Sequence, residues 1–87
     1  MSEGISRMYK NKYGLRNNIA GINIGKIRKA HVPRMSQRAL AEQLQLAGLD
    51  LDKNAIQRIE SGERFITDIE LLHFAKVFEI EIKDLFE

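Results

Sequence analysis

Apolar side chains recur along most of this chain at the three- and four-residue spacing that places them on one face of a helix. From Gly21 onward, Ile24 and Ile27 follow this spacing, and His31 is a further candidate for the same face. Pro33 cannot continue a helix, because it lacks the backbone N–H and disfavours helical geometry at the preceding residue. The pattern therefore predicts a first helix that begins near Gly21 and ends before Pro33.

Two further helices are predicted, each lying between a capping residue and a glycine. Ser36 and Asp52 have side-chain oxygens that suit a helix N-cap, whereas Gly48 and Gly62 suit the position just after a helix C-terminus. The apolar positions between these signals keep the helical spacing; they are Leu40, Ala41 and Leu44 in the second helix and Ile56 and Ile59 in the third. We therefore expect these two helices to pack by those apolar faces.

The last third of the chain continues this organisation. The segment Thr67-Asp68-Ile69-Glu70 has the sequence of a capping box, which opens a helix. The apolar residues that follow are Leu71, Leu72, Ala75 and Phe78 in a fourth helix, and Ile80, Ile82, Leu85 and Phe86 in a short closing helix. Strand-like alternation of useful length is absent from the sequence. The predicted fold class is all-α, a compact bundle of about five helices.

Residues 1–20 lack a helical period and contain two glycines, two tyrosines and several basic residues. We interpret them as a basic N-terminal arm, loosely ordered or docked, and residues 21–87 as the folded domain. The arm could be a tail, a strap on the domain or a segment that enters the minor groove of a nucleic acid. The tail and the strap are favoured, because a glycine-containing segment with few arginines is weak evidence for groove insertion.

The composition limits the classes of protein to consider. With 87 residues there is room for one domain, and the absence of cysteine excludes disulfide bonds and thiolate chemistry. No apolar run approaches the roughly 20 residues that a membrane-spanning helix needs. From these features we expect a soluble, cytoplasmic protein with no membrane partner.

The small net charge of +2 conceals a strong asymmetry along the chain. Residues 1–38 carry nine Lys and Arg and a single acid, whereas residues 39–87 carry five basic residues and eleven acids. A basic face of this kind attracts polyanions and releases their counterions. The alternative is that these are ordinary solvated charges.

The third predicted helix places amide and basic side chains on its outer face. With Ile56 and Ile59 directed inward, the outward positions are Lys53, Asn54, Gln57 and Arg58. Arginine can bond guanine O6 and N7, and asparagine or glutamine can bond adenine N6 and N7, in the major groove of DNA. These residues could also be a simple solvated face, but the basic first half of the chain favours DNA contact.

Catalytic and metal sites are not expected. His31 and His73 are too few for a zinc site, which needs three or four ligands. The sequence also has no glycine-rich phosphate loop, no nucleophile elbow and no evident acid–base pair. We therefore predict a protein that is not an enzyme and that has no metal and no cofactor.

Taken in order, several of these residues resemble the lambda-repressor-like (Cro/CI-type, XRE) helix-turn-helix family of DNA-binding proteins. The resemblance covers residues 21–87 and rests on Ser36-Gln37, Leu40-Ala41, Ile56, Ile59-Glu60, Ser61-Gly62, Phe65, Leu71-Leu72 and Ala75. The stretch from Gln45 to Leu51 is longer than the usual connector between the second and third helices. It matches a lengthened form found in a subset of the family.

The resemblance implies three sets of functional residues. The residues that match base-reading positions are Lys53, Asn54, Gln57 and Arg58. Those that match DNA-backbone positions are Ser36, Gln37, Ser61 and Arg64. Arg28 and Glu60 match a structural ion pair that holds the third helix against the first.

The function implied is a sequence-specific transcriptional regulator, in particular a repressor that binds a palindromic operator as a homodimer. Its partners would be double-stranded DNA and a second copy of the chain. The alternative is an antitoxin or adaptor module whose main role is to bind a protein partner. The acidic second half and the apolar C-terminus leave room for that alternative.

Overall fold

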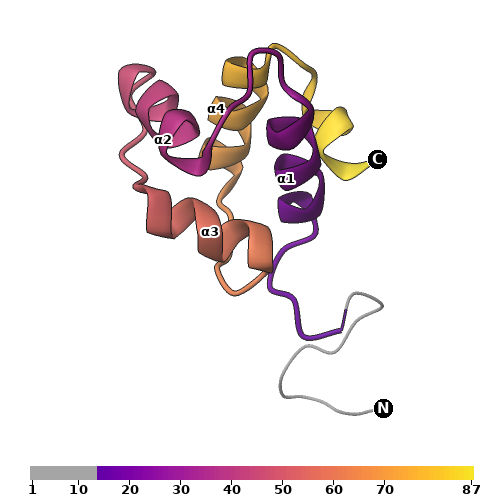
Figure 1. Ribbon diagram of the computed structural model, residues 1–87. Helices are drawn as coiled ribbons and strands as arrows, with labels where there is room; N and C mark the ends of the chain where they lie inside the picture. Colours follow the sequence, from indigo (N-terminus) through magenta and orange to yellow (C-terminus); the bar gives the residue numbers. More distant parts are fainter. Residues whose placement is uncertain (1–13) are drawn as a thin grey trace, which may run out of the picture.

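The computed structural model describes residues 14–87, so the predictions about residues 1–13 lie outside the described range. Within that range the chain forms an all-helical bundle, as the sequence predicts (Figure 1). The elements are α1 (Ala20–Ala30), α2 (Gln37–Leu46), α3 (Lys53–Ser61), α4 (Asp68–Phe78) and the 3-10 helix η2 (Ile82–Phe86). The expectation of about five helices is corrected to four α-helices and one short 3-10 helix in the described part of the chain.

The closing segment does not become a fifth α-helix, because α4 ends sharply just before it. Glu79 adopts the left-handed conformation, with φ of 59°, and the Ile80 N–H donates back to the Ala75 carbonyl. Glu81 is then extended, and the five residues of η2 form a tight turn. A segment this short favours i→i+3 hydrogen bonds over an α-helical ladder.

The predicted helix starts are confirmed at the atomic level. The side-chain oxygens of Ser36, Asp52 and Thr67 each accept a hydrogen bond from the backbone N–H three residues later, at 3.0, 2.8 and 3.1 Å. The Glu70 carboxylate accepts from the Thr67 N–H at 3.0 Å and completes the capping box. His31 departs from expectation: it lies just after α1 in extended backbone, not on the apolar face of that helix.

One apolar core joins the helices. Its fully buried large side chains come from every helix; they are Ile24, Leu40, Leu44, Ile56, Ile59, Phe74 and Leu85. α3 packs against α1 and α2, while η2 packs against α1 and α4. Figure 1 shows α3 along one edge of the bundle and η2 on the other side of α1.

Helices α1 and α3 approach each other very closely at Gly21. A Cβ atom at this position would collide with the backbone carbonyl of Ile59. Glycine is therefore required there if α3 is to keep its position against α1. None of the helices within residues 14–87 has the length and apolar character needed to cross a membrane.

Candidate nucleic-acid interface

Helix α3 has one buried apolar face and one exposed polar face. Ala55, Ile56 and Ile59 are buried, and the exposed residues are Lys53, Asn54, Gln57 and Arg58. Within residues 14–87, none of these four side chains takes part in a hydrogen bond or an ion pair. Their donors and acceptors are therefore available to a ligand that approaches α3 from solvent.

The orientation of α3 is held by a polar network around Glu60. Arg28 on α1 donates to the Glu60 carboxylate through Nε at 2.7 Å and through Nη2 at 3.0 Å. Gln37 on α2 donates to the same carboxylate at 3.0 Å, and Arg28 Nη1 also donates to the Met35 carbonyl at 3.1 Å. One carboxylate on α3 is thus tied to both α1 and α2. The structure contains the ion pair that the resemblance implied.

A segment before α1 also holds the C-terminal end of α3. Arg16 Nη2 donates to the Glu60 carbonyl at 3.0 Å, and Asn18 Nδ2 donates to the carbonyls of Ile59 and Arg64 at 3.0 and 2.7 Å. The Asn17 backbone N–H donates to the Gly62 carbonyl at 2.8 Å. We call residues 16–18 the strap. The carbonyls of Ile59 and Glu60 belong to the last turn of α3, whose carbonyls lack intrahelical partners, and those of Gly62 and Arg64 lie just after it.

The strap lies within the range assigned to the N-terminal arm, and sequence reasoning did not identify its residues as part of the site. The sequence does contain one indication of a helix start here, at Asn18. In the structure its Oδ1 accepts a hydrogen bond from the Gly21 N–H at 2.7 Å. Asparagine just before an apolar helical period is a common capping residue. The docking of Arg16 means that its charge is directed to α3 rather than to solvent.

The residues expected at the DNA backbone differ in how free their side chains are. Ser36 caps α2, and the Ser61 hydroxyl donates to the Arg58 carbonyl at 3.1 Å. Gln37 is engaged with Glu60, as described above. Ser36 and Gln37 nevertheless lie at the N-terminus of α2, where first-turn N–H groups suit a phosphate.

Arg64 is engaged in a second two-point ion pair. Its Nη1 and Nη2 atoms lie 3.0 and 3.1 Å from the two carboxylate oxygens of Glu70. Burial acts to raise the pKa of Glu70, but hydrogen bonds from Arg64 and Thr67 outweigh it, so the pKa lies below its ordinary value. The hydrogen bonds between Arg64 and Glu70 act in the opposite direction on Arg64 and raise the pKa of its guanidinium. This contact fixes the turn after α3 to the start of α4.

A polar groove of about 450 Å³ runs between α2 and the start of α3. Arg38, Glu42 and Gln45 line it from α2, and Asp52, Lys53 and Asn54 line it from the α3 side. Two of the predicted base-reading residues therefore share a groove with the exposed Arg38. Sequence reasoning did not single out Arg38, although it immediately follows the Ser36-Gln37 pair.

The charge asymmetry of the sequence becomes a partial separation between helices, because Glu42, Asp52 and Glu63 are exposed acids on α2 and beside α3. The exposed cations of the first half lie on α1, on α2 and in the loop between them; they are Lys26, Lys29, Arg34 and Arg38. The exposed acids at the other end of the chain lie on α4 and the segment after it; they are Asp68, Glu79, Glu81 and Glu87. The basic residues are therefore carried by the same helices that pack against α3.

Comparison of this chain with protein-family models, with curated proteins and with solved structures found no significant match. Within the part of the chain that the structure describes, no group of three His, Cys, Asp or Glu residues is arranged to hold a metal ion.

Proposed function

We propose that this chain is a sequence-specific DNA-binding transcriptional regulator with a lambda-repressor-like helix-turn-helix formed by α2 and α3. The observation that carries the proposal is the outer face of α3, where Asn54, Gln57 and Arg58 are exposed and unengaged within residues 14–87. These side chain types bond the edges of adenine and guanine in the major groove. The major groove of DNA is wide enough to admit one helix, and α3 lies at an edge of the bundle, where it can enter that groove.

A recognition helix must also be held rigidly, because base recognition depends on the orientation of its side chains as well as on their chemistry. The Glu60 network and the strap both supply this support at the C-terminal end of α3. Lys53, the fourth residue at a base-reading position, shares a groove with Arg38, whose exposed guanidinium is suited to phosphate contact. The start of α2 at Ser36 and Gln37 would present its first-turn N–H groups to a phosphate, and Ser61 would contact the DNA backbone from the end of α3.

The proposed mechanism is repression by occupancy. A homodimer would place two copies of α3 in successive major grooves of a palindromic operator, about 34–36 Å apart. Bound there, the protein would exclude other proteins from the same stretch of DNA. The exposed cations on α1 and α2 would supply the attraction to phosphate that brings the protein to DNA.

The decisive experiment is selection of bound sequences from a random pool of double-stranded DNA. We expect the full chain to enrich a two-fold symmetric motif whose half-sites are one helical turn apart. The matched control carries alanine at Asn54, Gln57 and Arg58, all of which are exposed, and it should enrich no motif while remaining folded. A pool that shows no enrichment with the unaltered chain would contradict the proposal.

A further inference from the structure

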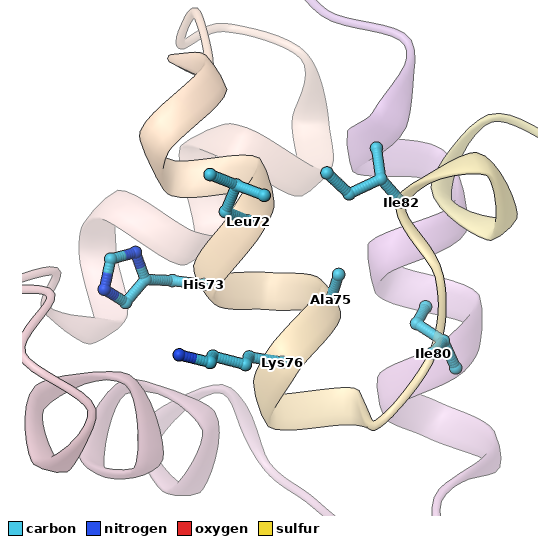
Figure 2. A pocket seen from close by; sticks show the side chains of 6 residues that line it. All are labelled: Leu72, His73, Ala75, Lys76, Ile80 and Ile82. Atoms are coloured by element: carbon cyan, nitrogen blue, oxygen red, sulfur yellow. The ribbon is translucent and has the colours of Figure 1, made fainter.

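The grooves on this surface differ in the chemistry of their linings. One of about 400 Å³ lies between α4 and the segment that follows it. Figure 2 shows Leu72 and Ala75 on α4 and Ile80 and Ile82 on that segment, and aliphatic side chains of this kind offer no hydrogen bonds to the edge of a base. The polar groove between α2 and the start of α3, described above, carries donors and acceptors instead.

Arg38 is the exposed cation that α2 brings to the polar groove. It is the second residue of α2, whose inner side is buried at Leu40 and Leu44. Within residues 14–87, its guanidinium takes part in no hydrogen bond and no ion pair. The N–H donors of Arg38 are therefore available to a ligand that enters the polar groove.

The same groove contains the start of α3. Lys53 and Asn54, the first two residues of α3, line it together with Arg38. Gln45 on α2 donates from Nε2 to the Leu51 carbonyl at 3.2 Å, so the connector just before α3 is fixed to α2. In a helix-turn-helix, the N-terminal residues of the second helix contact base edges. A guanidinium that shares a groove with Asn54 is thus placed beside the bases that the start of α3 would contact.

The charges around Arg38 distinguish between two kinds of ligand. A guanidinium is suited to a phosphate and also to the O6 and N7 atoms of guanine. Glu42, one helical turn after Arg38, and Asp52, the N-cap of α3, line the same groove. Their carboxylates repel a phosphate that approaches Arg38 within the groove, whereas the edge of a guanine carries no net charge. The lining of the groove therefore favours a guanine as the partner of Arg38.

We propose that Arg38 is a specificity-determining residue that recognises a guanine from α2, next to the base pair that Asn54 contacts. The inference rests on the proposed function, which assigned base recognition to α3 alone. The first helix of a helix-turn-helix crosses the DNA backbone, and the long arginine side chain reaches from there to a base edge. Each half-site of the operator then contains one guanine whose recognition does not depend on the side chains of α3.

The first test repeats the selection from random double-stranded DNA with Arg38→Lys, which keeps the charge but loses the two-point geometry of the guanidinium. We expect the motif of the unaltered chain, except that one guanine in each half-site is no longer preferred. That guanine should adjoin the position whose preference Asn54→Ala removes. Single substitutions are used, because one guanine in a half-site does not make a motif by itself. An unchanged motif, or a change that adjoins the position altered by Arg58→Ala, would overturn the inference.

The second test separates base recognition from phosphate contact. Fluorescence titrations compare the selected site with a site in which the guanine is replaced by adenine. The unaltered chain should bind the guanine site about tenfold more tightly or better, and Arg38→Lys and Arg38→Ala should bind both sites equally. Lys83→Ala, which removes an exposed cation on η2, should keep the discrimination, and circular dichroism melts establish that all variants fold. Discrimination that survives in Arg38→Lys, with equal weakening at both sites in Arg38→Ala, would show a phosphate contact and refute the inference.

Failure of this inference is distinguishable from failure of the proposed function. If the unaltered chain enriches no motif, the regulator is refuted, and the role of Arg38 is refuted with it. A motif that Asn54→Ala alters and Arg38→Lys leaves unchanged retains the regulator and refutes the role of Arg38 alone.

Discussion

Arg28 and Glu60 lie 32 residues apart in the sequence and meet in a two-point ion pair, with N–O distances of 2.7 and 3.0 Å. Their side chains are only 11% and 12% exposed. Glu60 directly follows the fully buried Ile59, so the pair joins the C-terminal end of α3 to the last turn of α1. Because Gln37 donates to the same carboxylate, three helices depend on one side chain.

We expect Glu60→Ala and Arg28→Ala each to destabilise the fold by more than the about 0–1 kcal/mol typical of an exposed pair. Removal of one partner from a buried pair leaves an uncompensated charge and costs up to about 3–5 kcal/mol. The double variant should lose less than the sum of the two single losses. Urea unfolding measures all three, with Glu63→Ala as the exposed control. Additive losses would show that the two side chains are not coupled.

Gln57→Ala and Arg58→Ala should weaken binding to the selected DNA site far more than binding to random DNA. Each lost bidentate base contact should cost about 1–3 kcal/mol of discrimination. Fluorescence titrations with both DNAs make the comparison, and Lys83→Ala on η2 is the control for loss of a side chain remote from α3. If both α3 variants bind the selected site like the unaltered chain, the assignment of the base-reading face is wrong.

The salt dependence of DNA binding should reveal the number of phosphates contacted. Log K should fall linearly with log salt, with a slope of about −0.9 per phosphate. Deletion of residues 1–13 removes Arg7, Lys10 and Lys12 but keeps the docked Arg16, so a flatter slope would assign DNA contact to the arm. An unchanged slope would indicate that the arm is a tail or packs on the domain and does not contact DNA. Salt-insensitive binding by the full chain would contradict the proposed function and favour a protein-binding module.

Asn18→Ala should loosen the C-terminal end of α3. The substitution removes one of the donors to the Ile59 carbonyl, which keeps the Gly62 N–H, and removes the Asn18 donor from the Arg64 carbonyl. A buried carbonyl left unpaired costs about 1–3 kcal/mol. Amide hydrogen exchange should accelerate in α3 and in the turn after it more than in α4. The matched control is Asn23→Ala, because Asn23 donates to the carbonyls of Leu85 and Glu87 instead. Equal acceleration by both variants would argue against a specific role of the strap.

The lowered pKa of Glu70 predicts a loss of stability in acid. A carboxyl whose pKa is lower in the folded state stabilises the fold above its ordinary pKa of about 4.3. This contribution disappears as the pH falls through the lowered value. Melting temperatures between about pH 6 and pH 2 should therefore fall less steeply for Glu70→Gln than for the unaltered chain. Glu63→Gln is the exposed control, and identical profiles for all three proteins would contradict the assignment.

The helical segments could be predicted from the sequence alone, because the signals that define them act over a few residues. Ser36, Asp52 and Thr67 bond to N–H groups three positions away, and the apolar spacing within each helix needs no information from distant parts of the chain. The outward face of α3 followed from the same spacing, since Ile56 and Ile59 determine which side is buried.

Apart from the Arg28–Glu60 pair, which the resemblance implied, the support of the outward face of α3 was decided only by the tertiary structure. Asn18 reaches Arg64 across 46 residues and Arg16 reaches Glu60 across 44, and no local pattern encodes such contacts. The engagement of Arg64 with Glu70, which an isolated arginine would not reveal, also depends on how the turn after α3 folds. The same holds for Leu72, an apolar residue at a helical spacing that the packing of α4 leaves exposed. Helix boundaries are set by neighbouring residues, whereas the side chains that remain available for binding are set by which helices cover them.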